Sequence, residues 1–232
     1  MTISKLTKLK KRLGVNFKEE RLLRQALVHR SYLNEHPDFN TGHNERLEFL
    51  GDAVLEIVVT EFLYLNFINT PEGDLTNWRA SLVNSRMLYE VAIELGVEDC
   101  LYLSRGEARD KHKKSRQFIL ANAVEALIGA IYLDQGPEAA KQFILKNIIS
   151  KLDDILKNQT YLDPKSRFQE KAQGVRGITP HYEIMDEQGP DHAKIFQVGL
   201  YIGEELIVTG QGSSKQEAQV DAATKGIKKM GW

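Results

Sequence analysis

The chain has 232 residues, which suits two small domains, and its 42 % apolar and 27 % charged residues are ordinary for a globular protein. Its single cysteine, Cys100, excludes an intramolecular disulfide, and we interpret it as a small buried hydrophobe. The formal net charge of −1 excludes binding of nucleic acid through a global positive field, so any such binding must use local clusters.

The N-terminal segment is basic, but no apolar run follows it, so we expect no signal peptide. The longest apolar stretch that we identify, residues 57–68, is interrupted by Thr60, Glu61 and Asn66. We therefore expect no segment that spans a bilayer, no membrane partner and a cytoplasmic location.

Most of the chain shows apolar residues at helical spacing, which predicts an all-α domain over residues 1–157. The two clearest groups are Leu22, Leu23, Ala26 and Leu27, and Leu82, Leu88, Val91 and Leu95. We expect Gly96 to cap the second of these helices at its C-terminus. A further helix should begin near Pro137 and continue towards Asn158.

The spacing of apolar residues changes after a short polar segment, residues 158–164, which we interpret as a linker. Asp163 and Pro164 are typical of the start of a helix. Alternating apolar residues then predict strands at 182–185, 196–202 and 206–209. A last helix should open with a capping box on Ser213 or Ser214. Residues 165–232 thus form a small α+β domain of α-β-β-β-α order.

Acidic residues lie on two segments that are otherwise apolar. In a helix over residues 44–65, Glu45, Glu48 and Asp52 stand at i, i+3 and i+7, on one face. Nearly every other position is apolar, which is typical of a buried helix. The segment 118–133 is equally apolar and carries one carboxylate, Glu125.

Several buried carboxylates need compensation, because burying one without a partner costs several kcal/mol. Basic side chains could supply it, and Arg46, Arg79, Arg86 and Arg116 are available. The alternative is a hard divalent cation such as Mg²⁺, and no Cys/His cluster with zinc spacing competes with it. The residues alone leave an ion-pair network and a functional site equally open.

The run NERLEFLGDAVL at residues 44–55 resembles the signature motif of the ribonuclease III family. Four further stretches resemble the same family in the same order: ALVHRSY at 26–32, EGDLTNWRASLV at 72–83, LSRGE at 103–107 and ILANAVEALIGAIYLDQG at 119–136. The C-terminal part resembles the double-stranded-RNA-binding domain that follows this nuclease in bacterial enzymes.

The resemblance implies an all-α nuclease domain that works as a homodimer and hydrolyses both strands of double-stranded RNA. It assigns Glu48, Asp52 and Glu125 as metal ligands, with Asp52 and Glu125 as catalytic acids and Glu45 as a further acid near the scissile phosphate. The expected cofactor is Mg²⁺, with Mn²⁺ able to substitute, and no small-molecule cofactor. The expected products carry 5′-phosphate and 3′-hydroxyl ends.

Three further positions of the nuclease part carry expectations. Phe49 matches an aromatic residue that packs across the dimer interface. A glycine inside a helix lowers its stability, so Gly51 needs an explanation. We expect either the close approach of another backbone or simple packing at this position. Asn122 stands where the family usually has Asp. As a metal ligand it is either tolerated or raises the metal requirement; otherwise it marks an inactive nuclease.

The resemblance also assigns RNA contacts in the C-terminal domain, where duplex RNA offers 2′-hydroxyls and phosphates more than bases. The expected contacts are Ser166, Gln169, Glu170, His192, Ser214 and Lys215. Gln216 replaces a second lysine, which should lower phosphate affinity slightly.

The function that follows is processing of structured RNA precursors, ribosomal RNA among them. One rival is a non-catalytic double-stranded-RNA-binding protein on a nuclease-like fold, which Asn122 alone favours. A weaker rival is an all-helical phosphohydrolase for small phosphates, which the C-terminal pattern opposes.

Overall fold

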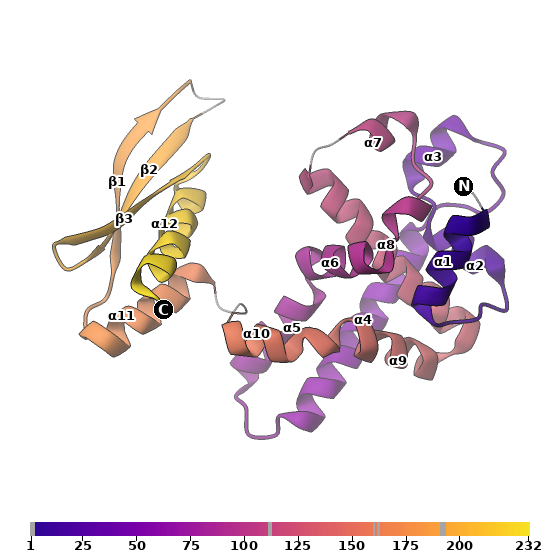
Figure 1. Cartoon of the computed structure of the whole chain (residues 1–232), viewed down its shortest axis with the longest axis horizontal. Coiled ribbons are helices and arrows are strands. Elements are labelled where there is room, and N and C mark those ends of the chain that lie inside the picture. The colour runs from indigo at the N-terminus through magenta and orange to yellow at the C-terminus, as the bar shows by residue number, and fades with distance from the viewer. Residues whose placement is uncertain (1–2, 111–112, 160, 162, 191–193) are drawn as a thin grey trace. The chain divides into compact units, whose positions relative to one another are not determined.

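The computed structural model describes residues 3–110, 113–159, 161, 163–190 and 194–232 (Figure 1). The chain divides into two compact units, Met1–Tyr161 and Leu162–Trp232, and the division falls within the segment interpreted as a linker. Each unit has a hydrophobic core of its own.

The first unit is helical. Its helices are α1 (Ile3–Leu13), α2 (Glu20–Ala26), α3 (Arg30–Glu35), α4 (Glu45–Asn66), α5 (Glu72–Val83), α6 (Ser85–Leu95), α7 (Arg105–Arg109), α8 (Lys113–Gln135), α9 (Pro137–Asn147) and α10 (Leu152–Asn158). Short 3-10 turns occur at Glu98–Cys100 and Ile149–Lys151. Gly96 ends α6 in the left-handed conformation, as predicted.

The prediction of one continuous helix from Pro137 to Asn158 is wrong. The chain leaves regular helical geometry at Ile148, where φ is −116°, and a 3-10 turn separates α9 from α10. Both Ile148 and Ile149 are buried at this break. The bend therefore keeps adjacent β-branched side chains in the core while the chain changes direction.

Helix α8 runs through the core of the first unit and packs directly against α4 (Figure 1). The α8 side chains without exposed surface include Leu120, Val124, Leu127, Ile128 and Ile131. A helix that is apolar on nearly all sides is stable only when surrounded by protein or lipid.

Helix α8 also corrects the expectation that no segment could span a bilayer. Among the described residues, Lys114–Gln135 is long and apolar enough to cross a membrane, judged by length and composition only. Of its most apolar 18-residue window, 67 % is buried inside the protein. The core helix of a globular unit meets the same two criteria, because it too is surrounded by apolar groups.

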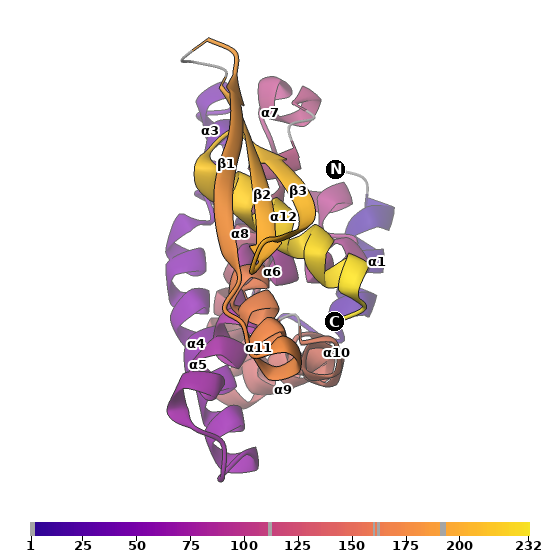
Figure 2. The same cartoon turned by 90° about the vertical axis from the view of Figure 1, so that its left-hand side faces the viewer.

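The second unit has the predicted α-β-β-β-α order. It consists of α11 (Pro164–Arg176), β1 (His181–Gln188), β2 (Ile195–Ile202), β3 (Glu205–Gly212) and α12 (Lys215–Met230). The strands form an antiparallel sheet in the order β1-β2-β3, and α12 crosses one face of it (Figure 2). The core between sheet and helices is built around Phe168, Leu200 and Ala222.

The helix starts of the second unit follow the capping chemistry read from the sequence. Asp163 caps α11 by accepting the N–H of Lys165, and Pro164 occupies the first turn. Ser214, not Ser213, is the N-cap of α12, and its hydroxyl accepts the N–H of Glu217 at 3.1 Å. The Glu217 carboxylate accepts the N–H of Ser213 in return.

Candidate active site

Helix α4 presents the first group of acids. Its N-cap, Asn44, is buried and donates its side-chain amide to the carbonyl of Ala26 at 3.4 Å, which ties the start of α4 to the end of α2. Glu45 is exposed and lies 3.4 Å from Arg30 and 3.6 Å from His43. This acid is therefore partly neutralised, unlike the acids one and two turns further along.

Glu48 is joined to α8 by a hydrogen bond. The side-chain amide of Asn122 donates to Glu48 Oε1 at 2.9 Å. Partial burial raises the pKa of Glu48, the Asn122 hydrogen bond lowers it, and the charges of Glu45 and Asp52 raise it. The side-chain amide of Asn122 thus holds the Glu48 carboxylate in place. An ionised aspartate at position 122 would have no N–H to donate to it.

Glu125 is the most perturbed acid of the group. Burial raises its pKa to about 8, and the negative charges of Asp52 and Glu48 add to the effect. These contributions place acids from α4 and α8 within electrostatic reach of one another. The structure therefore brings Glu48, Asp52, Asn122 and Glu125 into one region, although they are far apart in the sequence.

Arginine does not neutralise these acids. Arg79 pairs with Glu56 at 3.2 Å, and Arg116 pairs with Glu98 at 2.9 Å. Arg86 pairs with Glu90 at 3.4 Å. In the part of the chain that the structure describes, no ion pair involves Glu48, Asp52 or Glu125. An ion-pair network therefore does not explain them.

The donor set fits a hard divalent cation whose coordination is completed from outside the protein. Among the described residues, no three His, Cys, Asp or Glu side chains lie close enough to hold a metal ion alone. The three carboxylates and the Asn122 carbonyl are nevertheless oxygen donors, and Mg²⁺ commonly keeps several waters and shares substrate phosphates. A cation here would stabilise the ionised form of Glu125, which burial and the neighbouring acids disfavour.

The acids lie where the two long helices touch through their backbones. A Cβ atom added to Gly51 of α4 would overlap the carbonyl of Glu125 and lie 2.9 Å from the nitrogen of Gly129. A Cβ added to Gly129 of α8 would overlap the carbonyl of Leu47 and lie 3.1 Å from the nitrogen of Gly51. Close approach of another backbone, one of two explanations for Gly51, is confirmed. The sequence reading missed Gly129.

Phe49, predicted at a dimer interface, is on α4 and 81 % exposed. A hollow of about 720 Å³ beside it is lined by apolar and charged residues that include Leu50, Leu133 and Glu45. Ile57 and Tyr64 of α4 are also exposed. Several large apolar side chains exposed on one helix are typical of a surface that another protein covers.

The predicted RNA contacts that the structure describes lie on the surface of the second unit. Ser166, Gln169 and Glu170 are exposed on α11. At the N-terminus of α12, Lys215 is exposed, with its Nζ 3.6 Å from Glu187 and 5.8 Å from the centre of the Phe196 ring. His192 lies outside the described residues.

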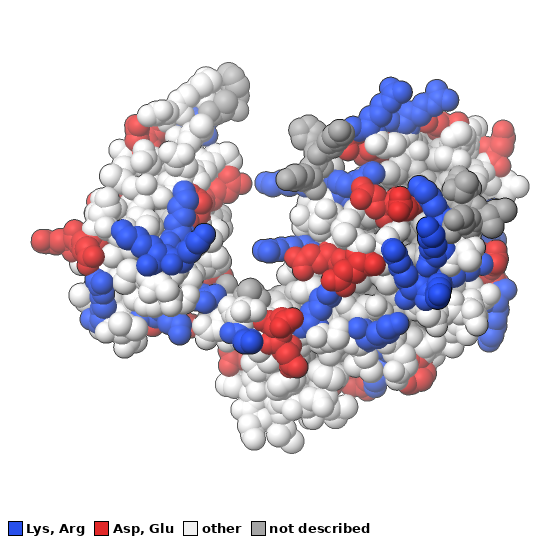
Figure 3. All heavy atoms as spheres, in the orientation of Figure 1, with Lys and Arg blue, Asp and Glu red and all other residues white. Residues whose placement is uncertain are grey.

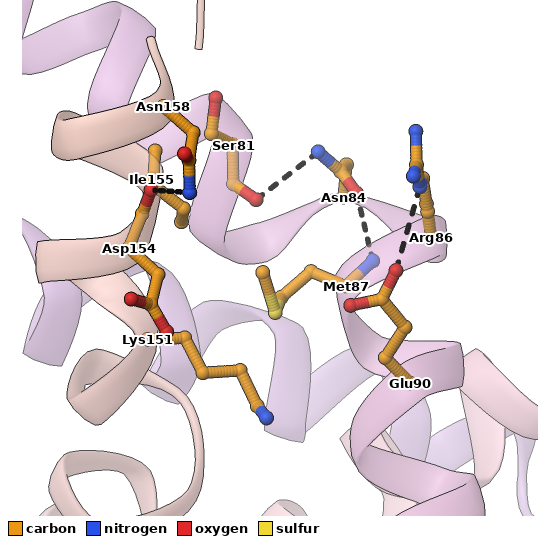
Figure 4. A pocket seen from close by; sticks show the side chains of 9 residues that line it. All are labelled: Ser81, Asn84, Arg86, Met87, Glu90, Lys151, Asp154, Ile155 and Asn158. Carbon is orange, nitrogen blue, oxygen red and sulfur yellow. Dashed lines mark hydrogen bonds and ion pairs between the residues drawn. The ribbon is translucent and has the colours of Figure 1, made fainter. Parts of the chain in front are cut away.

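A second hollow contains none of the predicted acids. It has a volume of about 360 Å³ and lies between the end of α5, the start of α6 and α10 (Figure 4). Arg86 and Glu90 pair on its rim, and Asn84 caps α6 by accepting the N–H of Met87 at 2.9 Å. Both signs of charge line it and its polar groups serve the local fold, so we assign it no ligand.

The surface charge agrees with the formal charge of the chain. On the face shown in Figure 3, each unit carries both Lys or Arg and Asp or Glu side chains, and on the second unit several Lys and Arg side chains gather in one group. RNA binding must therefore use local geometry, as the sequence predicts.

Comparisons with known proteins agree with the fold. Residues 19–152 match the ribonuclease-III-like family, and residues 164–230 match the double-stranded RNA binding motif. Ribonuclease 3 of Carboxydothermus hydrogenoformans is 44 % identical over 96 % of this chain and 94 % of its own length. Ribonuclease 3 of Enterococcus faecalis is 41 % identical over 97 % of this chain and 96 % of its own.

A solved structure agrees as well. The nuclease domain of ribonuclease III from Campylobacter jejuni superposes with a TM-score of 0.54 and 39 % identity, covering 62 % of this chain and 96 % of that one. Fold and site together define a two-domain nuclease whose second domain binds double-stranded RNA. The chain belongs to the ribonuclease III family, and it is an endoribonuclease for double-stranded RNA.

Proposed function

We propose that this endoribonuclease hydrolyses phosphodiester bonds in both strands of duplex RNA with the help of Mg²⁺, for which Mn²⁺ can substitute. The observation that carries the proposal is the pair of partly buried acids, Glu48 and Glu125, which lie within electrostatic reach of each other on two packed helices and form no ion pair among the described residues. Such acids persist at a cost unless a cation compensates them.

Glu48, Asp52, Asn122 and Glu125 would hold the cation through oxygen atoms. When bound, the cation supplies an activated water and neutralises charge on the phosphoryl oxygens. Asp52 and Glu125 act as the catalytic acids, and the exposed Glu45 lies near the scissile phosphate. Cleavage on the 3′-oxygen side of the phosphate then leaves 5′-phosphate and 3′-hydroxyl ends.

The second unit would position the duplex. Ser166, Gln169 and Glu170 on α11, which lie within the residues that match the double-stranded RNA binding motif, would offer polar groups to a minor groove. Ser214 and Lys215 would offer a helix N-terminus and a cation to phosphates beside the neighbouring groove. His192 is proposed as a further minor-groove contact.

A homodimer would supply two sites, one for each strand. The exposed ring of Phe49 and the apolar hollow beside it support an interface between two copies. The solved Campylobacter jejuni nuclease domain is described as having a region involved in dimer formation. The substrates would be structured RNA precursors, including ribosomal RNA, in the cytoplasm.

The test is the variant Glu125→Gln, which keeps the shape of the side chain and removes its charge. We expect cleavage of long duplex RNA in Mg²⁺ to be lost on a gel, while RNA binding stays within about twofold of wild type because the second unit is unchanged. The control is Glu90→Gln, whose carboxylate pairs on the surface with Arg86 and should be dispensable. Normal cleavage by Glu125→Gln would refute the proposal.

The rival is a double-stranded-RNA-binding protein without catalysis, which the asparagine at position 122 favours. The same gel separates the two, because a non-catalytic protein would shift the duplex without shortening it. Cleavage by wild type that disappears with a chelator and returns with Mg²⁺ would exclude the rival.

A further inference from the structure

The two glycines at the crossing of α4 and α8 form a reciprocal contact. The Cβ position of Gly51 is filled by the carbonyl of Glu125, four residues before Gly129. The Cβ position of Gly129 is filled by the carbonyl of Leu47, four residues before Gly51. On each helix, therefore, a backbone carbonyl fills the space that a side chain at the glycine of the other helix would need.

The proposed metal ligands come from the same turns. Glu125 provides one contacting carbonyl through its own backbone. Glu48 follows Leu47, and Asp52 follows Gly51. The distance between the acids of α4 and those of α8 is therefore set by backbone atoms in contact. Backbone atoms move much less to relieve a clash than side chains, which can change rotamer.

We propose that Gly51 and Gly129 are positioning residues that set the distance between the acids of α4 and those of α8. This inference rests on the proposed metal-dependent function. Any side chain at either glycine would part the helices by an amount on the order of 1 Å, because carbon and oxygen need van der Waals separation. Catalytic groups tolerate errors of about 0.5 Å, and a misplacement of about 1 Å can lower the rate about 100-fold.

The experiment is Gly129→Ala in the full chain, because position 129 contributes no side chain to the site. We expect Mn²⁺ alone, measured by calorimetry without RNA, to bind about tenfold more weakly than to wild type. We expect cleavage of duplex RNA to fall about 100-fold at saturating substrate, with the KM for RNA little changed. Raising the Mg²⁺ concentration should restore part of the rate.

Two controls separate positioning from general damage. Gly174→Ala changes a helical glycine of α11 that has no atom within 4 Å of the added Cβ, so it should alter neither metal affinity nor rate. Leu88→Ala empties a fully buried site on α6 and should lower the melting temperature while leaving Mn²⁺ affinity unchanged.

The outcomes are distinguishable. Gly129→Ala that binds Mn²⁺ and cleaves RNA like wild type would overturn the inference while leaving the proposed function intact. A wild type that neither binds Mn²⁺ nor cleaves would instead overturn the proposed function itself. If Gly129→Ala is unfolded, the measurements are repeated in trimethylamine N-oxide, which favours the folded state. Weak Mn²⁺ binding there supports the inference, and wild-type binding refutes it.

Discussion

At the residue scale, Glu125 joins the chemistry of the site to the stability of the fold. Its pKa rises from an ordinary 4.5 to about 8, first through burial and then through Asp52 and Glu48. The folded protein therefore holds a proton on Glu125 that the unfolded chain has already lost at neutral pH. The site gains stability either from that proton or from a cation.

A pH dependence follows for the metal-free protein. Because the folded pKa of Glu125 lies above the unfolded one, its contribution to stability is full below pH 4.5 and is lost as the pH rises through about 8. We expect the melting temperature of wild type in chelator to fall relative to Glu125→Gln between these pH values. Mg²⁺ added at pH 8 should raise the wild-type melting temperature. Parallel pH profiles for the two proteins would contradict this.

Asn122 makes a second residue-scale prediction. In Asn122→Asp the amide that donates to Glu48 is lost, and a further negative charge joins the group. We expect the metal-free variant to melt at a lower temperature than wild type, through like-charge repulsion. The Mg²⁺ concentration for half-maximal cleavage should fall on the order of tenfold, the change in metal affinity that a substitution beside a metal site typically produces. An unchanged Mg²⁺ requirement would show that Asn122 does not touch the ion.

At the scale of the element, three helices of the first unit, α3, α6 and α7, are capped by a polar side chain at their N-terminus. Asn84 lies between α5 and α6 and serves both, because its Oδ1 accepts the N–H of Met87 while its amide donates to the carbonyls of Ala80 and Ser81. Asn44 stands at a similar position before α4, but its side-chain amide donates to the carbonyl of Ala26 and does not cap α4. A capping residue in the sequence therefore predicts a helix start without deciding its partner.

Asn84→Ala tests this double role. We expect it to lower the free energy of unfolding by about 1–2 kcal/mol, at the upper end for a lost N-cap, because carbonyls at the end of α5 lose their donor too. Urea denaturation followed by circular dichroism measures the change. The substitution Asn84→Asp keeps the acceptor and should recover part of the loss. Equal stability of all three proteins would contradict the assignment.

At the scale of the whole molecule, a net charge of −1 means that the protein as a whole does not attract RNA. We therefore expect binding to depend on a few cations of the second unit, and Lys215, at the start of α12, is the one that we propose. Lys215 lies 3.6 Å from Glu187, whereas Lys225 pairs more closely, at 2.6 Å, with Asp221 of the same helix. The two lysines should therefore contribute differently to RNA affinity.

Lys215→Ala should weaken binding to duplex RNA of any sequence and reduce the slope of log affinity against log salt by about one. Lys225→Ala, the matched control, should change that slope much less. Titration of a non-cleaving Glu125→Gln background by fluorescence anisotropy at several salt concentrations measures both. Equal slopes for the two lysine variants would remove Lys215 from the proposed interface.

The sequence by itself determined the helical character of the first unit, the α-β-β-β-α order of the second and the acids at i, i+3 and i+7. These follow from hydrophobic period and capping chemistry, which are local. Only the tertiary structure decided that Gly129 meets Gly51, that Asn122 donates to Glu48, and that the chain bends at Ile148. Such features depend on atoms of distant segments, whose separation and dielectric surroundings exist only once the helices have packed.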